Sequence, residues 1–460
     1  MKQSGIHGAK RQFTSAASLA ALGMHLQKLD LLGPVRERVK IAQKTVKHAP
    51  TDKLYDALIA LLAGAHGVVE INTRLRSDAA LQTAFGRSAC AEQSVVQETL
   101  NACNGEIVAQ MQAAVDVIYR QHSQGYRHDY EQAWQRLDVD LTGMPCGPKA
   151  ALATKGYFAK QRYRRGRQLG RVLATRYHEV VVDQLLAGNT YLRTALPALV
   201  QASEQTLALD EAKRQRTIVR IDAGAGSVDD INWLLARGYQ VHAKDYSGQR
   251  ARLLAESVSE WVDDPAVPGR QVGWIQAPAT AYLRPLHRLA ARCRKQDGQW
   301  AVGVIISSLA PAAVLALTAS APHPHCAEQD ILLAYAHFYD QRGGGIETAI
   351  KDDKQGLGIT RRNKKRFEAQ QMVMLLGVLA HNILVWARHW LTPHLPKLAH
   401  FGLLRLVRDV FHISGFVQCD RQGQVVSIRL NQAAPLAHDL AAALHALLVP
   451  AHVAVILGQT

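Results

Sequence analysis

The sequence predicts an α/β protein, and three observations lead to that class. Residues 1–129 carry apolar side chains at helical spacing, most clearly at 54–63 and 94–117. The period then changes to two at 136–142, where polar and apolar residues alternate as in a half-buried strand. After that point strand-like and helix-like stretches follow one another, which is the pattern of a sheet covered by helices.

The elements can be followed in order along the chain. Strand-like stretches are short and either alternate or are apolar throughout; they are residues 136–142, 168–176, 179–187, 217–222, 240–243, 272–275, 302–309 and 313–318. A helical stretch ending near Leu209 follows the third strand. The later helix-like stretches have apolar residues three or four positions apart; they are residues 228–237, 331–339, 346–354 and 364–391.

These patterns indicate four regions. Residues 1–129 form a mostly helical N-terminal domain. Residues 130–249 and 326–395 form an α/β core, whose order is three strands, helix, strand, helix, strand and then long helices. Residues 250–325 are a β-rich insertion in that core, and residues 396–460 are a C-terminal region.

The charge balance predicts a polyanionic partner. The 460 residues include 54 Lys and Arg against 38 Asp and Glu, which gives a formal net charge of +16. Such an excess is typical of proteins that bind nucleic acid or an anionic membrane. The two uncharged stretches long enough to span a bilayer, 301–327 and 440–460, are interrupted by proline, so we expect no membrane partner. Six cysteines without a CxxC pair indicate reduced thiols and a cytoplasmic protein.

Acidic residues stand at the ends of two predicted strands and on a predicted helix. Asp138 and Asp140 lie two residues apart on one strand and therefore face the same side. Asp222 ends the strand TIVRID, and Glu347 lies on a later helix. Carboxylates that converge in this way suit Mg²⁺, which takes oxygen ligands and leaves positions open for phosphate. Two such ions about 4 Å apart can promote phosphodiester cleavage.

At this point the chain resembles the DDE transposases of bacterial insertion sequences, in the branch whose third signature reads Tyr-x2-Arg-x3-Glu-x6-Lys. Tyr339, Arg342, Glu347 and Lys354 carry that signature, although four residues, 343–346, separate Arg from Glu where the family has three. The family's first Asp lies in an Asp-x-Thr context, which selects Asp140, and its second Asp follows a strand, as Asp222 does. The resemblance spans roughly residues 130–395 and implies an RNase H-like catalytic core.

The resemblance also implies a function. The protein would be a transposase that cuts the ends of its element in a metal-dependent reaction and joins them to target DNA by cut-and-paste transposition. Asp140, Asp222 and Glu347 would hold Mg²⁺, in two ions that Mn²⁺ can replace. Residues 1–129 would recognise the transposon-end DNA. The protein would act as a dimer in its DNA complex, in the bacterial cytoplasm and associated with the nucleoid.

Basic residues supply candidate phosphate contacts. On the signature itself the resemblance assigns Tyr339, Arg342 and Lys354, and Lys351 lies on the same helix. Two basic runs add further candidates, which are Arg164 and Arg165 in the first run and Arg361, Arg362, Lys364 and Lys365 in the second. Trp274 and Trp300 lie in the insertion, where a core role is favoured over stacking on a base.

Three alternatives share parts of the pattern. Asp138 and Asp140 fit the DxDx(T/V) box of haloacid-dehalogenase-type phosphatases, but the residues before them, 131–136, are largely polar. The turn Asp222-Ala-Gly224-Ala-Gly226 fits S-adenosylmethionine-dependent methyltransferases, but three strands are expected before it. An inactive relative that only binds DNA would not need the complete set of three carboxylates.

Overall fold

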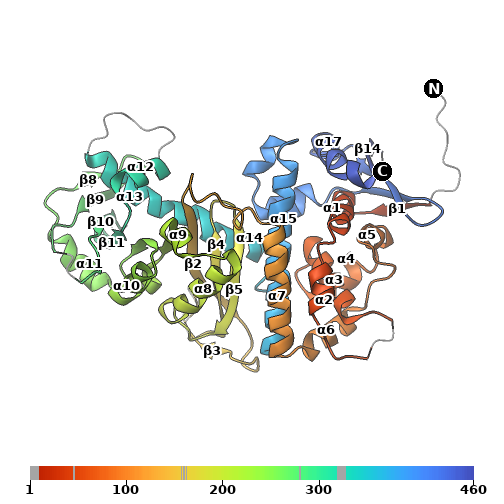
Figure 1. Ribbon diagram of the computed structural model, residues 1–460, viewed down its shortest axis with the longest axis horizontal. Helices are drawn as coiled ribbons and strands as arrows, with labels where there is room; N and C mark the ends of the chain where they lie inside the picture. The colour runs from red at the N-terminus through yellow and green to blue at the C-terminus, as the bar shows by residue number, and fades with distance from the viewer. Residues whose placement is uncertain are drawn as a thin grey trace. The chain divides into compact units, whose positions relative to one another are not determined.

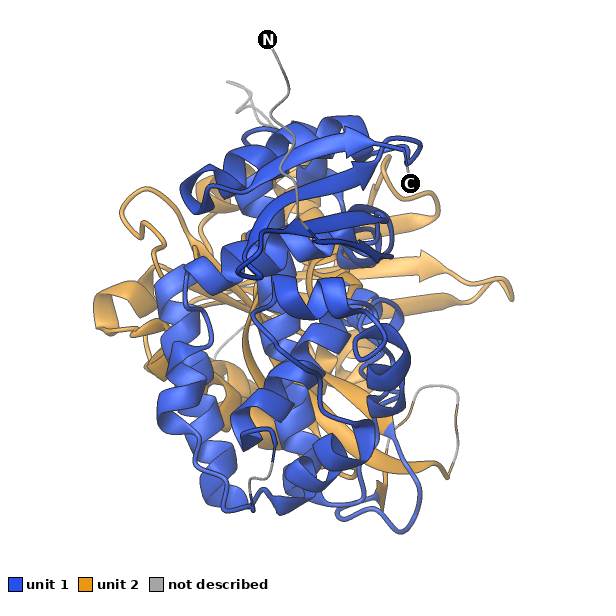
Figure 2. Cartoon of the chain, turned by 90° about the vertical axis from the view of Figure 1, so that its right-hand side faces the viewer, with its two compact units in different colours: residues 1–123, 145–153, 349–460 blue, residues 124–144, 154–348 orange. Residues whose placement is uncertain are grey.

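The structure is a computed structural model that describes residues 10–44, 47–156, 158, 161, 163–278, 281–318 and 328–459. The chain divides into two compact units (Figure 2). Unit 1 consists of residues 1–123, 145–153 and 349–460, and unit 2 of residues 124–144 and 154–348. Each unit therefore collects segments that lie far apart in the chain, whereas the predicted regions follow the sequence in longer blocks.

Unit 2 is built on one mixed sheet with the strand order β3-β4-β2-β6-β7-β11-β10-β9-β8, and β5 pairs with β4. The strands are β2 (Gln135–Pro145), β3 (Thr154–Lys155), β4 (Arg165–Ala174), β5 (Glu179–Ala187), β6 (Thr217–Ile221), β7 (Gln240–Lys244), β8 (Val262–Asp263), β9 (Arg270–Trp274), β10 (His287–Arg294) and β11 (Trp300–Ser307). β2, β6 and β7 run parallel to one another. The predicted α/β class is confirmed.

The region 250–325 does not form a separate sheet. Its strand β11 pairs antiparallel with β7, so β8 to β11 extend the central sheet at that edge. The strand expected at 313–318 is wrong, because these residues belong to helix α12 (Pro311–Thr318). Pro311 explains the difference, since proline at the first helical position is pre-set for the helix and its missing N–H costs nothing there.

Helices of unit 2 pack on this sheet. They are α8 (Leu192–Leu207), α9 (Glu211–Gln215), α10 (Val228–Ala236), α11 (Gly248–Ala255), α12 and α13 (Glu328–Arg342), with the short turn η2 (Ala223–Ala225) and the π-helix η3 (Gly343–Glu347). α13 lies against β9 and β11 and closes an apolar core that includes Leu289, Ile305, Tyr335 and Phe338. Trp274 packs at the edge of this core, and Trp300 is more exposed, with Arg292 against its ring.

Unit 1 is mostly helical. Its helices are α1 (Ala17–Lys28), α2 (Gly33–Arg38), α3 (Pro50–Leu62), α4 (Ile71–Arg74), α5 (Ala79–Ala84), α6 (Gln93–Ala102), α7 (Gly105–His122), α14 (Thr348–Gln355, beginning one residue before the unit boundary), α15 (Phe367–Leu391), α16 (Leu403–Arg405) and α17 (Ala437–Leu448), with short turns η1 (Val68–Glu70), η4 (Pro396–His400), η5 (Leu406–Val410) and η6 (Val449–Ala451). α15 lies beside α7 and also contacts α3 and α6 (Figure 1). In the part of the chain that the structure describes, α15 is the one helix long and apolar enough to span a membrane, and 94% of its apolar window is buried in the protein.

A second sheet in unit 1 joins the two ends of the chain. Its order is β1-β12-β13-β14, with β1 (Lys10–Thr14), β12 (Gly415–Cys419), β13 (Val425–Asn431) and β14 (Ala454–Gly458). β1 pairs antiparallel with β12, and β13 pairs parallel with β14. Residues 396–460 are therefore not a separate module, since they share a sheet with the first described residues.

Candidate active site

The parallel pairing of β2 with β6 places two of the predicted carboxylates side by side. The register sets Asp138 opposite Arg220 and Val139 opposite Ile221. Two residues farther along each strand on the same face stand Asp140 and Asp222. Because β6 ends at Ile221, both residues stand where the pairing of the two strands stops, Asp140 midway along β2 and Asp222 directly after β6.

Asp140 lies in a strongly negative and mostly buried environment. Its side chain is 16% exposed, and burial is the main reason that its pKa is raised to about 6. The charges of Asp222 and Glu347 raise the pKa further, whereas Arg342 lowers it. Asp222 and Glu347 are thus close enough to Asp140 for their charges to act on its pKa, which is the arrangement expected of a shared site.

Asp222 is held by the turn that follows β6. Its Oδ1 accepts a hydrogen bond from the N–H of Gly224 at 2.8 Å, an Asx turn that fixes the start of η2. Gly226 allows this turn to touch the neighbouring chain, since a Cβ there would lie 1.8 Å from the carbonyl oxygen of Lys244. Packing therefore accounts for the glycine that resembled a methyltransferase turn.

Glu347 reaches the site through a π-helix. The hydroxyl of Thr348 donates to the carbonyl of Gly343 five residues earlier, and the segment 343–347 forms one wide turn between α13 and α14. A π-turn accommodates one more residue than an α-turn, and such turns often occur at functional sites. The extra residue between Arg342 and Glu347 is absorbed here, and their side chains meet across the turn at 3.2 Å.

Arg342 lies among the carboxylates and is 2% exposed. Its Nη2 is 3.2 Å from Oδ2 of Asp140 and donates to the carbonyl of Val139 at 2.9 Å. Its Nη1 contacts Oε1 of Glu347. The guanidinium is therefore the cation that balances the cluster in this state of the protein.

The donor set suits a hard divalent cation. Three carboxylates, from the middle of β2, the end of β6 and the π-helix η3, supply oxygen ligands, and Arg342 forms ion pairs with two of them, Asp140 and Glu347. Among the residues that the structure describes, no three acidic, His or Cys side chains stand in ligating geometry. Arg342 forms ion pairs with both Asp140 and Glu347 in this structure. A bound cation would require the guanidinium to move aside.

Tyr339 lies one turn before Arg342 on α13. Burial raises the pKa of its phenol, and the nearby charges of Asp222 and Glu347 raise it further. The hydroxyl therefore stays protonated beside the carboxylates and keeps its ability to donate a hydrogen bond.

Asp138 does not stand where a nucleophile could react. It is fully buried, and its two carboxylate oxygens accept from Nε and Nη2 of Arg220 at 2.6 and 2.9 Å. This corrects the phosphatase alternative, in which Asp138 would attack the substrate. Arg220 escaped the sequence prediction, although a charged residue inside the buried strand TIVRID was a signal that a partner must exist.

The other predicted phosphate contacts differ in exposure. Exposed side chains are found at Arg164, Arg165, Lys351, Arg361 and Lys365, and Lys354 is half-buried. Arg362 is only 2% exposed, and burial lowers its pKa to about 9. This corrects its prediction as a surface contact, because its Nη2 instead donates to the carbonyl of Ala65 at 2.9 Å.

Lys364 is also engaged inside unit 1. Its Nζ donates to Oε1 of Gln97 at 2.6 Å, and burial lowers its pKa to about 8. The second basic run therefore alternates between exposed residues and residues that pack on the helices of unit 1.

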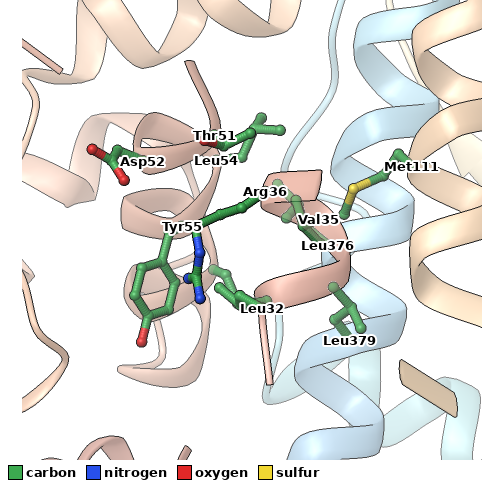
Figure 3. Close-up of a pocket in the computed structure, with 11 residues that line it drawn as sticks. Leu32, Val35, Arg36, Thr51, Asp52, Leu54, Tyr55, Met111, Leu376 and Leu379 are labelled. Atoms are coloured by element: carbon green, nitrogen blue, oxygen red, sulfur yellow. The ribbon is translucent and has the colours of Figure 1, made fainter. Parts of the chain in front are cut away.

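Two cavities in unit 1 are lined by none of the predicted site residues. The pocket of Figure 3 lies among α2, α3, α7 and α15, has mostly apolar walls, and holds about 10 Å³, which is room for about one water. A neighbouring cavity of about 180 Å³ is lined in part by Arg36 and Arg87. Both arginines are already paired with aspartates, Arg36 with Asp30 and Arg87 with Asp52 and Asp56.

Comparison with known proteins identifies the family of the chain. The sequence model of the family described as transposase DDE domain group 1 matches residues 7–450. A solved structure, described as a piggyBac transposase synaptic complex with hairpin DNA, is similar with a TM-score of 0.45 and 10% identity, over 87% of this chain and 82% of that one. No curated protein matches the sequence.

Proposed function

Because this chain belongs to the DDE transposase family, we propose that it is an insertion-sequence transposase that cuts DNA at the ends of its own element and joins them to target DNA. One observation carries the proposal. Asp140, Asp222 and Glu347 share one charged environment around Arg342.

The strand order supports an RNase H-like core for this reaction. β5-β4-β2-β6-β7 forms a continuous part of the sheet, with β2, β6 and β7 parallel. Asp140 and Asp222 stand on the neighbouring strands β2 and β6, where their pairing stops, and Glu347 ends the π-helix η3. The proposed fold thus places the three carboxylates without needing residues from unit 1.

The residues divide the chemistry between them. Asp140, Asp222 and Glu347 would hold two Mg²⁺ ions, which Mn²⁺ can replace. Bound in this way, the ions would supply activation of the attacking oxygen and stabilisation of the leaving one. Arg342 has only donors, so once displaced from the carboxylates it would bind phosphate oxygens. Tyr339 would donate a hydrogen bond from its phenol hydroxyl to a phosphate oxygen nearby.

Exposed and half-buried basic side chains would bind the DNA backbone. We assign this role to Arg164, Arg165, Lys351, Lys354, Arg361 and Lys365. Contacts of this kind dominate affinity and make it salt-dependent. Arg362 and Lys364 are left out, because their packing engages them inside unit 1. The partners would be transposon-end and target DNA, bound by a dimer in the bacterial cytoplasm at the nucleoid.

The proposed function can be tested on DNA that carries both flanks of the protein's own gene. We expect the full chain to cut this DNA at one fixed position on each side, with 3′-hydroxyl ends, and only with Mg²⁺ or Mn²⁺ present. End mapping by primer extension measures the positions. Cutting at scattered positions, or equal cutting in excess chelator, would contradict the proposal.

Two neighbouring glycines of η3 should respond differently to substitution. At Gly345, a Cβ would lie 2.6 Å from Cγ2 of Thr175 and 2.8 Å from Oδ2 of Asp138. Gly345→Ala should therefore push η3 away from β2 and slow cleavage by about 100-fold, the cost of a displacement of about 1 Å at a reacting group.

The matched control is Gly344→Ala. Gly344 is exposed, and a Cβ there meets nothing within 4 Å. This variant should cleave at the wild-type rate in a single-turnover assay. Equal effects of the two substitutions would show that the closeness of η3 to β2 does not matter for the reaction.

A further inference from the structure

A row of buried polar residues crosses the sheet beneath the site. Asp138 of β2 pairs in register with Arg220 of β6, and Arg220 pairs with His242 of β7. All three are fully buried. Burying polar side chains on three adjacent strands of a core costs folding free energy unless hydrogen-bond partners compensate for it.

Arg220 connects three elements at once. Its Nε and Nη2 donate to the two carboxylate oxygens of Asp138, which joins β6 to β2. Its Nη1 donates to the carbonyl of Phe338 at 2.8 Å, which joins β6 to α13. The guanidinium carbon also lies 4.9 Å from the centre of the Phe338 ring.

The π-helix η3, which follows α13, lies against the same ion pair. Gly345 of η3 approaches Asp138 so closely that a Cβ would meet its Oδ2. The Asp138 carboxylate therefore contacts β6 through Arg220 and lies directly under the turn that carries Glu347.

The three elements that meet at this ion pair, β2, β6 and α13 with its continuation η3, also carry the proposed metal ligands. Asp140 lies two residues after Asp138 on β2, and Asp222 lies two residues after Arg220 on the β6 side. Glu347 follows α13 by one π-turn. We propose that Asp138 and Arg220 are positioning residues, whose ion pair fixes the separation of Asp140, Asp222 and Glu347 and so sets the affinity of the site for divalent metal. This inference rests on the proposed function.

Burial alone does not explain why an ion pair occupies this position. Replacing a buried ion pair with apolar residues of similar volume is often neutral or stabilising. Bidentate geometry instead gives directional contacts between planar groups, which apolar side chains cannot supply. Groups that orient metal ligands in this way typically change metal affinity or activity by about 10- to 100-fold when removed.

The test uses the full chain with both partners replaced, Asp138→Leu with Arg220→Met. The matched control replaces another buried bidentate pair of the same sheet, Asp183→Leu with Arg171→Met, which joins β4 to β5. Calorimetric titration with Mn²⁺ measures metal affinity without DNA, and single-turnover cleavage is measured across Mg²⁺ concentrations.

We expect the Asp138/Arg220 variant to bind Mn²⁺ about 10- to 100-fold more weakly and to need correspondingly more Mg²⁺ for cleavage. The control should match the wild type in both. Wild-type metal affinity in the Asp138/Arg220 variant would overturn the proposal, and so would slower cleavage with an unchanged metal requirement.

Asp138→Asn decides the question if the double variant does not fold. Asn keeps the shape and one acceptor but loses the charge and the second acceptor. It should weaken Mn²⁺ binding by about 10-fold, and unchanged binding would overturn the proposal. Failure of the wild type to cut any flanking DNA would contradict the proposed function alone, because the Mn²⁺ titration tests the ion pair independently.

Discussion

Replacing Asp140 or Asp222 with Asn, or Glu347 with Gln, is expected to slow DNA cleavage by at least about 10³-fold, because each change removes a ligand from the ions that promote the reaction. Binding of end DNA should stay within a few-fold of the wild type. None of the three substitutions removes a cationic contact to phosphate, and each lowers the negative charge near the DNA.

The same gel-shift and single-turnover cleavage assays should be run on Asp297→Asn as the control. Asp297 is an exposed carboxylate in the turn between β10 and β11 and lies outside the cluster. Its variant should cleave normally. Near wild-type cleavage by Glu347→Gln would mean that the third carboxylate is misassigned, while loss of cleavage in Asp297→Asn would mean that the assay reports general loss of charge.

Arg342→Ala should destabilise the metal-free protein by about 3 kcal/mol at pH 7.5, since it leaves the mostly buried carboxylate of Asp140 without its cation. The loss should be smaller at pH 5. In the folded protein the pKa of Asp140 is about 6, which is above its ordinary value. Ionisation of Asp140 therefore lowers the free energy of unfolding as pH rises through 6. Removing Arg342 raises that pKa further and enlarges the loss above pH 6, whereas at pH 5 Asp140 is mostly protonated.

Divalent metal should reverse this defect. Mn²⁺ no longer has to displace the guanidinium, so it should raise the melting temperature of Arg342→Ala more than that of the wild type. Arg171→Ala is the control, because it also breaks a buried Arg–Asp pair, whose partner Asp183 is not one of the three proposed metal ligands. The same Mn²⁺-induced shift in Arg342→Ala and in the wild type would show that Arg342 does not compete with metal.

The strand and helix periods in the sequence were enough to predict most of unit 2. The stretches at 179–187 and 217–222 correspond closely to β5 and β6, because short apolar runs in a covered sheet are distinctive. The signature spacing was also informative. The one extra residue between Arg342 and Glu347 is accommodated by the π-turn of η3. That turn depends on hydrogen bonds that a sequence pattern does not encode.

Long-range packing explains what the sequence could not predict. The pairing of β1 with β12 joins residues about 400 positions apart, and no local pattern marks it. Arg362 stands in a run of basic residues that reads as a solvated surface, yet it is buried against the carbonyl of Ala65. For Arg220 the sequence did indicate a buried charge, since the residues on either side of it in the strand are apolar. Its partner Asp138 could be identified only from the strand register.

The site itself is tested most directly by an anomalous-scattering map of crystals of the DNA-bound protein grown with Mn²⁺. Mn²⁺ peaks are expected within coordination distance of Asp140, Asp222 and Glu347, and the Arg342 guanidinium is expected to contact a phosphate instead of the carboxylates. Mn²⁺ peaks elsewhere in unit 2, with Arg342 still bonded to Asp140 and Glu347, would contradict this expectation.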